Sequence, residues 1–380
     1  MGRDLFTRTS YEAARVAHKV TKTSHVTREA EQKAHSTGKL NPAVDPAVDM
    51  IRRSLMRFEP KDDGTFEVTI GCPIPIESTC DTTGSMGDNV DIAMKNFPDL
   101  YELAAEFLPG YDPQFALGIF GDVCDRFVFQ RPQFEMTPDA IVNYLKNMVP
   151  EHAGGDAPED PHYGLFAAAY LTSTYANRIG LKGYHFLITD ATAHSRFSYD
   201  TFVRIFGDKF LEKVHENGFE NISKESISSL SIHEVVLDLL KRSHAYMIHI
   251  GSSWGSSNFW EQIYGAERVV MIPSTEYLPV AEAAIIGLTE GTLDVGDLKE
   301  YLKKHIQPVK VVNRLATELE KIDLRAQEAL RYKIISNGHQ IPKAGDIFRS
   351  KTDLWPISDG KTSESGSSDD SEASTKLEWL

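Results

Sequence analysis

Cysteine is scarce in this chain of 380 residues, with only three in the whole sequence. Cys72, Cys80 and Cys124 are odd in number and show no spacing typical of zinc ligands. Such usage is typical of proteins in a reducing compartment, where thiols stay free. We therefore expect buried thiols and no zinc site built from these cysteines.

Long apolar stretches are missing as well. No run approaches the ~20 apolar residues that a membrane-spanning helix needs. Residues 1–7 contain no apolar signal core, and Phe6 stands where a myristoylation motif has Ser or Thr. The sequence therefore predicts a cytoplasmic protein that does not bind a membrane.

Positive charge is under-represented, because 40 Lys and Arg face 55 Asp and Glu, a formal net charge of −15. A protein that binds nucleic acid in general carries a basic surface, so this function class is excluded. An acidic surface favours solubility and, locally, the binding of cations. The hydrophobic share of 41% is that of a globular protein with a sizeable core.

Two enzyme motifs are absent from the sequence: Gly-x-x-x-x-Gly-Lys-Ser/Thr and Gly-x-Ser-x-Gly. Cys124 has no adjacent histidine that could act as its base. These absences favour a protein that acts by contact over one that acts by turnover.

Short apolar segments do occur, and they alternate with helical patterns. Strands are expected at 66–70, 74–80, 115–120, 127–129, 184–189, 245–250 and 268–272. Helices are expected at 48–57, 88–107, 138–148, 163–175, 199–215, 232–242, 259–264, 277–288, 298–305 and 311–332. This alternation predicts an α/β fold, doubly wound, with a mostly parallel six-stranded sheet, one antiparallel edge strand and helices on both faces.

Composition divides the chain into four regions. Residues 1–64 form a polar helical arm, which either packs on the main domain or docks an acidic partner through its basic residues. Residues 65–290 carry the alternating pattern, and residues 291–357 form a helical extension. Residues 358–380 form an acidic, Ser-rich tail that we expect to be disordered.

The most informative stretch is Asp81-Thr82-Thr83-Gly84-Ser85, directly after the strand at 74–80. It carries one carboxylate and two hydroxyls at alternate positions. Hard oxygen ligands at short range suit Mg²⁺, Mn²⁺ or Ca²⁺ and not zinc. The alternative is that Ser85 caps the helix that begins near Asp88.

Two later segments place further oxygen atoms near the same edge of the sheet. Asp190 follows the strand at 184–189, and a glycine-rich acidic loop covers 154–160. Ligands of parallel sheets bind at the carboxyl ends of the strands, so we expect the three loops to converge on one cation. The alternatives are that Asp156 or Asp160 caps the next helix and that Asp190 is a turn residue.

These segments together resemble the von Willebrand factor A-like family. The resemblance covers residues 66–289. The matching pieces are Asp81–Met86, Gly154–Glu159, Leu187–Ala191, Ile248–Gly251, Phe259-Trp260 and Arg268–Val270. Three further pieces resemble a bacterial intracellular branch of the family: Gly121-Asp122, Gln133–Glu135 and Lys182–Tyr184.

The resemblance implies a metal-ion-dependent adhesion site. Thr83 and Ser85 would bind Mg²⁺ directly, and Asp81 and Asp190 would bind it through water. The family has a Thr in the middle loop, whereas residues 151–162 contain no Ser or Thr. Asp156 is the expected substitute, with Asp160 as the second choice. A third carboxylate would strengthen cation binding and weaken the pull of the ion on an acidic partner.

Two functions of different class follow. The first is a non-enzymatic intracellular scaffold that binds a protein partner through the Mg²⁺ face. The partner would offer an acidic side chain to the ion, and the remaining affinity would come from the surrounding rim near His194, Phe197 and Trp254. The second is a Mg²⁺-dependent phosphohydrolase with Asp81 as nucleophile, since Asp-x-Thr resembles a haloacid-dehalogenase signature. That signature has a second Asp where this chain has Thr83, which favours the first function.

The tail gives a direct test of the division into regions. Residues 358–376 contain almost no apolar side chain and cannot bury enough surface to order themselves. Truncation before Ser358 should therefore leave the melting temperature, followed by circular dichroism, unchanged. A large drop would mean that Trp379 and Leu380 dock on the folded part.

Overall fold

The computed structural model describes residues 6–20, 28–62, 66–152, 154, 158–251, 254–322 and 340–341. The predicted disordered tail lies outside these residues, and so does the part of the predicted helix 311–332 that follows Ile322. Asp156 lies outside them as well.

The central sheet has six strands in the order β10-β9-β8-β4-β5-β6. Neighbouring strands are parallel except β5 and β6, which are antiparallel at one edge, as predicted. The strands are β4 (Pro73–Asp81), β5 (Asp112–Phe120), β6 (Phe129–Gln130), β8 (Gly183–Thr189), β9 (Ser243–Ile250) and β10 (Val269–Ile272). The winding reverses between β4 and β8, which is where ligands bind in such sheets.

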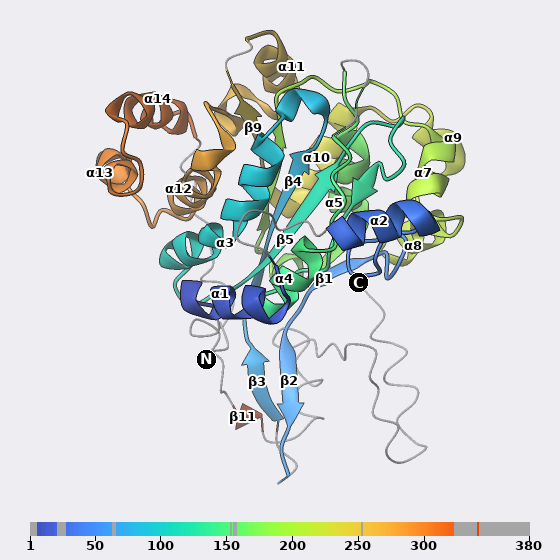
Figure 1. The fold of residues 1–380 in the computed structure, drawn as a ribbon, viewed down its shortest axis with the longest axis horizontal. Coiled ribbons are helices and arrows are strands. Elements are labelled where there is room, and N and C mark those ends of the chain that lie inside the picture. The colour runs from blue at the N-terminus through green and yellow to red at the C-terminus, as the bar shows by residue number, and fades with distance from the viewer. Residues whose placement is uncertain are drawn as a thin grey trace.

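Helices cover both faces of this sheet (Figure 1). Every residue of β4, β5 and β8 is buried, as expected for parallel strands between two helical layers. One face carries α3 (Asn89–Phe107), α4 (Pro138–Leu145), α6 (Tyr175–Arg178) and α12 (Leu278–Glu290). The other carries α5 (His162–Tyr170), α7 (Tyr199–Phe206), α8 (Phe210–Glu216), α9 (Lys224–Ile227), α10 (Ile232–Arg242) and α11 (Trp254–Tyr264).

Helical extensions flank the domain, as predicted. They are α1 (Arg8–Ala17), α2 (Arg28–Thr37), α13 (Val295–His305) and α14 (Val309–Leu319). Phe6, just before α1, stacks on Tyr101 of α3 with ring centroids 4.1 Å apart. Glu318 of α14 accepts a hydrogen bond from the backbone N–H of Met271 in the edge strand β10, at 3.3 Å. Both extensions therefore contact the domain directly.

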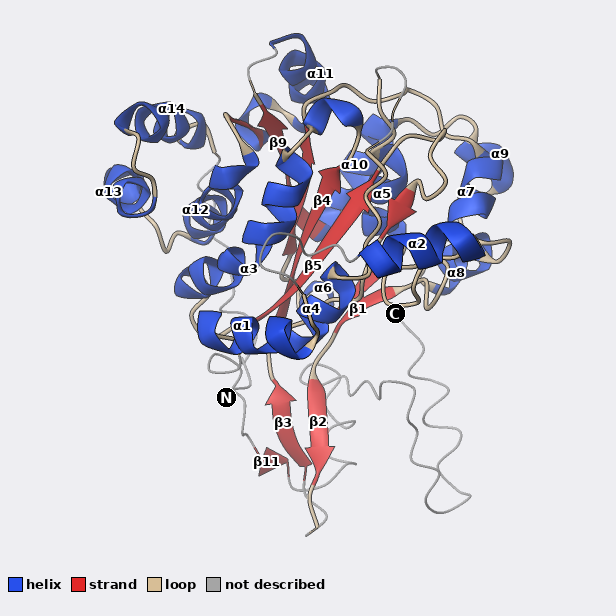
Figure 2. Ribbon diagram, viewed as in Figure 1, coloured by secondary structure: helices blue, strands red, loops and turns tan. Residues whose placement is uncertain are grey.

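The predicted helix at 48–57 is wrong. This segment forms β1 (Arg52–Ser54), which pairs with β7 (Thr172–Thr174), and the start of β2 (Arg57–Pro60). Arg52 fixes the extended course of the chain, because its buried guanidinium donates to the Arg131 carbonyl at 2.5 Å. β2, β3 (Phe66–Ile70) and β11 (Gln340–Ile341) form a second, small sheet, which projects below the central one in Figure 2.

Two further helix predictions were too long. The predicted helix 163–175 ends at Tyr170, because Thr172–Thr174 has β-branched residues and pairs with β1. The predicted helix 199–215 is interrupted at Gly207, which has φ +84°. A positive φ of this kind is readily adopted only by glycine and ends α7 there.

A buried ion pair fastens the middle of β4. Arg131 donates from Nε and Nη2 to the two carboxylate oxygens of Glu77, at 2.5 and 2.6 Å, and both side chains are buried. Burial acts to raise the pKa of Glu77, but Arg131 holds that pKa below its ordinary value. Arg131 also bonds the Ala167 carbonyl at the end of α5 and Thr172 Oγ1 at the start of β7. The ion pair thus connects β4, α5 and β7.

Replacement of Arg131 should therefore be severe. Arg131→Met leaves Glu77 as an uncompensated buried charge, and we expect a loss of about 3–5 kcal/mol in the free energy of unfolding, measured with urea. Lys299→Met is the matched control, since Lys299 pairs with Glu320 on the surface and should cost at most ~1 kcal/mol. Similar losses for the two variants would contradict the role of the buried pair.

Candidate metal centre

The first loop of the candidate centre begins where β4 ends. Asp81 is fully buried, and its Oδ1 accepts hydrogen bonds from the backbone N–H and the hydroxyl of Thr83, at 2.8 and 2.7 Å. The chain then forms the short 3-10 helix η2 (Gly84–Met86) before α3. Asp81 therefore folds the loop back on itself, with the hydroxyls of Thr83 and Ser85 3.3 Å apart.

The second loop follows β8 and is tied to the first by two hydrogen bonds. Thr189 Oγ1 donates to Asp81 Oδ2 at 2.6 Å, and Ser85 Oγ donates to Asp190 Oδ1 at 2.8 Å. These contacts join the ends of β4 and β8 at the point where the winding of the sheet reverses. Four of the five predicted site residues, Asp81, Thr83, Ser85 and Asp190, therefore lie together.

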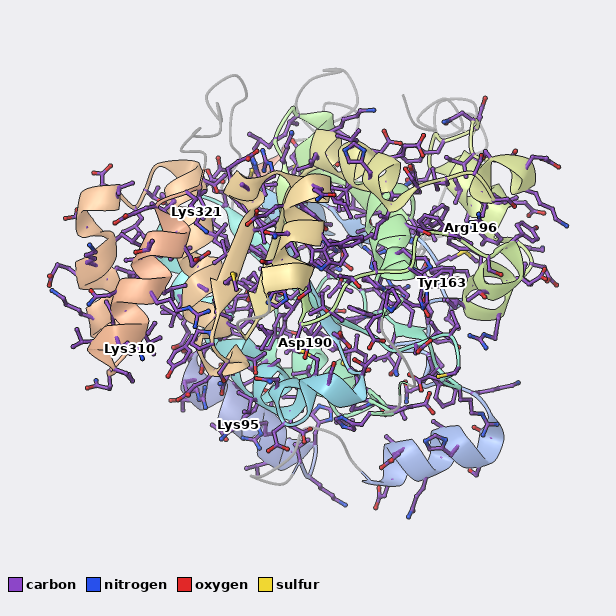
Figure 3. All side chains as sticks on the ribbon, turned by 90° about the horizontal axis from the view of Figure 1, so that it is seen from above. Lys95, Tyr163, Asp190, Arg196, Lys310 and Lys321 are labelled. Atoms are coloured by element: carbon purple, nitrogen blue, oxygen red, sulfur yellow. The ribbon has the colours of Figure 1, made fainter. Side chains whose placement is uncertain are left out.

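The second loop has its own support. Trp260 Nε1 donates to the Ala191 carbonyl at 2.8 Å. Ser256 Oγ donates to the Asp190 carbonyl at 3.3 Å and lies 2.6 Å from His249 Nε2. These contacts fix the backbone at Asp190 and Ala191. In Figure 3 Asp190 lies near the middle of the face seen from above, whereas Arg196 lies toward its rim.

Negative charge in this cluster is stabilised only by uncharged donors. Burial raises the pKa of Asp81 to about 6, the hydrogen bonds from Thr189 and Thr83 act to lower it, and the nearby charge of Asp190 acts to raise it. Among the described residues, no basic side chain is a cause of the shift in the pKa of Asp81. A bound cation would favour the ionised carboxylate in this environment.

The oxygen atoms present fit a small, hard cation. Two adjacent ligands of an octahedral Mg²⁺, each at about 2.0–2.1 Å, lie roughly 3 Å apart. The spacing of 3.3 Å between the hydroxyls of Thr83 and Ser85 is close to this value. Within the described ranges, no three His, Cys, Asp or Glu side chains are placed to hold a metal ion. Any cation bound here therefore requires the hydroxyls.

The middle loop brings different residues to the centre from those predicted. Asp156 lies outside the described residues. Asp160 accepts a hydrogen bond from the Val123 N–H at 2.8 Å and lies 3.4 Å from the His162 ring, so it fastens the loop after β5. Gly154 has φ +121°, and a Cβ built there would lie 3.2 Å from Thr83 Cβ. The loop therefore passes directly over Thr83.

Glu159 is the residue that the sequence reasoning missed. Its side chain is buried, and its backbone pairs with Thr192 and His194 beside the Asp190 loop. Burial and then the charge of Asp81 raise its pKa to about 8, against a hydrogen bond from Thr83 that acts to lower it. Its Oε2 has no hydrogen-bond partner in the described part of the structure. This orphaned oxygen is the kind of atom that a cation would satisfy.

The expected partner-binding rim is only partly available. His194 is half-buried, but Phe197 is buried and packs against the rings of His162 and Phe202. Phe197 is therefore a core residue, since its aromatic neighbours on α5 and α7 occupy both sides of it. The side chain of Trp254 lies outside the described set.

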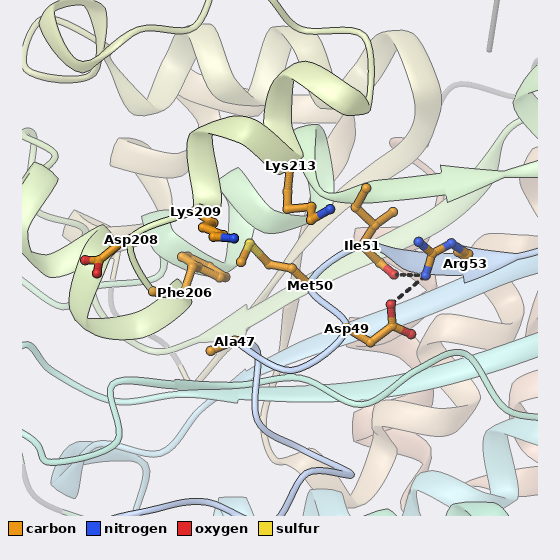
Figure 4. Close-up of a pocket in the computed structure, with 10 residues that line it drawn as sticks. Ala47, Asp49, Met50, Ile51, Arg53, Phe206, Asp208, Lys209 and Lys213 are labelled. Atoms are coloured by element: carbon orange, nitrogen blue, oxygen red, sulfur yellow. Dashed lines mark hydrogen bonds and ion pairs between the residues drawn. The ribbon is translucent and has the colours of Figure 1, made fainter. Parts of the chain in front are cut away.

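A hollow of about 380 Å³ lies elsewhere, between residues 47–53 and the junction of α7 and α8 (Figure 4). Lys209 and Lys213 line one side, and Arg53, which is paired with Asp49, lines the other. None of the predicted site residues lines it, so it is separate from the candidate centre.

No protein-family model and no curated protein sequence matches the chain. Solved structures similar to it include proximal thread matrix protein 1 (PTMP1) from the mussel byssus, with 14% identity, a TM-score of 0.36 and coverage of 57% of this chain and 48% of PTMP1. A second PTMP1 structure is described as having a zinc-occupied MIDAS motif. The pilus adhesin SpaC from Lactobacillus rhamnosus GG has 13% identity, a TM-score of 0.38 and coverage of 61% and 33%.

The chain thus spans about half the length of PTMP1 and a third of SpaC. The TM-scores lie below 0.5, and the fold assignment rests on the topology of the sheet. Among the helices in the described ranges, none combines the length and the apolar character that a membrane crossing needs.

The Thr189 hydroxyl, which donates to Asp81 and accepts from the Ala191 N–H at 3.1 Å, can be tested with one substitution. Thr189→Val keeps the shape of the side chain and removes the donor, so one buried carboxylate oxygen loses its partner. We expect the free energy of unfolding, measured with urea, to fall by about 1–3 kcal/mol. Thr317→Val, at an exposed position of α14, is the control and should change it by less than ~0.5 kcal/mol. An unchanged stability in Thr189→Val would contradict this contact.

Proposed function

We propose that this chain is a non-enzymatic protein-binding module that engages its partner through a divalent cation, Mg²⁺ in the first instance, with Mn²⁺ and Ca²⁺ as alternatives. The observation that carries the proposal is the meeting of the β4 and β8 loops, where Ser85 donates to Asp190 and Thr83 to Asp81. Two hydroxyls and two carboxylates thus meet, and in the described part of the chain no lysine or arginine side chain bonds to them.

The residues would divide the work between direct and water-mediated contacts with the cation. Ser85 is exposed, and with Thr83 it would bind the cation directly. Asp81 and Asp190 would bind it through water and orient the two hydroxyls. The cation would supply a positive centre that attracts an oxygen of the partner. This division keeps the roles that the family resemblance implies.

The third loop is where this chain departs from the family. Glu159 is the best supported contributor, because its carboxylate is buried beside Thr83 and one of its oxygens has no partner in the described structure. Asp156 stays a prediction. With a third carboxylate nearby, the cation would attract an acidic side chain of the partner only weakly. Much of the affinity would then come from the surrounding protein surface.

The alternative function as a phosphohydrolase is less well supported. A nucleophilic carboxylate has to reach the phosphorus atom, but Asp81 is fully buried and both its oxygens accept hydrogen bonds, from Thr83 and Thr189. Thr83 also replaces the second carboxylate that would act as the acid. Asp81 is therefore better suited to hold the loop than to attack a substrate.

Three broader elements belong to the same proposal. They are the cytoplasmic location, the membership of a bacterial intracellular branch, and the assignment of this role to residues 65–290 with flanking regions at 1–64, 291–357 and 358–380. Each follows from the sequence patterns and the family resemblance.

Calorimetry with Mg²⁺ tests the centre. Ser85→Ala should lower the affinity for Mg²⁺ at least tenfold, because it removes a direct ligand, and Asp81→Ala by roughly 10–100-fold, because it removes a supporting group. Ser228→Ala changes an exposed serine far from the loops and serves as the control. A partner captured by the wild-type chain should bind more weakly with EDTA and to Asp81→Ala. Capture that ignores both treatments would overturn the proposal.

A further inference from the structure

Two carboxylates beside the candidate centre each have one oxygen that is not satisfied. Asp122, just after β5, is 2% exposed, and Glu159 is 5% exposed. Asp122 Oδ2 and Glu159 Oε2 have no hydrogen-bond partner among the described residues. A buried carboxylate oxygen without a partner is costly, so each of these oxygens requires an explanation.

The backbone holds the two residues on adjoining loops. The Val123 N–H donates to Asp160 Oδ2 at 2.8 Å, so the neighbours of Asp122 and Glu159 in sequence are directly bonded. The Asp122 N–H is held in turn by Asp125 Oδ2 at 2.9 Å. On the other side, the Glu159 N–H donates to the Thr192 carbonyl at 2.9 Å. Asp122 and Glu159 therefore lie close to each other in a fixed arrangement.

The charge around this pair is of one sign. The charged side chains that influence Glu159 are Asp81, Asp122 and Asp160, and all three are acids. The His162 ring lies 3.4 Å from Asp160, but in the described structure no ion pair joins a lysine, arginine or histidine to Asp122 or Glu159. Buried charges in proteins are otherwise paired with opposite charges or bound to metals.

We propose a second cation site, distinct from the one at Thr83 and Ser85, in which Asp122 and Glu159 bind Ca²⁺ through their unsatisfied oxygens. Two carboxylates balance the charge of one divalent cation. Ca²⁺ accepts carboxylate, carbonyl and water oxygens in flexible geometry, whereas Mg²⁺ needs a nearly ideal octahedron. Glu159 is shared with the proposed function, where it stands beside the first centre, but Asp122 takes no part in that centre, so the two proposals can fail separately.

Calorimetry with Ca²⁺ distinguishes the two sites by their stoichiometry. The wild-type chain should bind two ions, Asp122→Asn one, Ser85→Ala one, and the double variant none. Asp208→Asn, at an exposed position after α7, is the matched control and should bind two. Asn at 122 keeps the oxygen that faces the Cys124 N–H, so the fold should be retained.

Thermal unfolding gives a second readout, because the difference in melting temperature between Asp122→Asn and the wild type should change sign when Ca²⁺ is added. In EDTA, Asp122→Asn should melt a few degrees above the wild type, because it removes an unpaired negative charge beside Glu159. In saturating Ca²⁺ the wild type should have the higher melting temperature, since bound Ca²⁺ stabilises it more than it stabilises the variant. A residue with only a structural role would lower the melting temperature in both conditions.

The outcomes separate this proposal from the first one. If the wild type binds one ion that Asp122→Asn leaves in place and Ser85→Ala removes, the second site is overturned and the first stands. If the single ion is lost in Asp122→Asn and kept in Ser85→Ala, the second site stands and the proposed function fails. A melting temperature of Asp122→Asn below that of the wild type in EDTA would also overturn the second site.

Discussion

The candidate centre depends on one buried carboxylate. Asp81 ends a strand that is buried along its whole length, and it has Thr83 on one oxygen and Thr189 on the other. Its hydrogen bonds shape the first loop and join it to the second. They do so without a basic partner, which leaves room for a cation from solution. The positions of Ser85 and Asp190 follow from this arrangement.

Two buried acidic residues of β4, Glu77 and Asp81, differ in the partners that stabilise their carboxylates. Glu77 is neutralised by Arg131, and that pair fixes the middle of β4 to its neighbours. Asp81, four residues later, has only hydroxyl and amide donors. The middle of the strand therefore has a basic side chain as the partner of its carboxylate, whereas the carboxyl end has none. This difference separates a structural carboxylate from one that suits metal binding.

The sequence predicted the central sheet well, because fully buried strands such as β5 and β8 contain short apolar runs, Phe115–Phe120 and Phe186–Ile188. It failed where distant contacts decide the local structure. Residues 52–54 are extended because Arg52 bonds the chain at Arg131, 79 positions away. Glu159 was not predicted, because the missing hydroxyl of the middle loop was assigned to Asp156. The burial of the Glu159 side chain beside Thr83 depends on the tertiary structure and cannot be read from the sequence. Phe197 likewise looked like a surface aromatic until α5 and α7 were packed against it.

The contact of α14 with the sheet has a consequence for the behaviour of the protein at high concentration. β10 is an edge strand, and a bare edge presents unpaired backbone groups that can pair with another molecule. Glu318 occupies the Met271 N–H, and its carboxylate places a negative charge along that edge. A second chain that approached edge to edge at Met271 would meet a helix and a carboxylate that is paired with Lys321, instead of a free N–H group. The carboxyl-terminal extension thus protects the domain against self-association through β-sheet pairing.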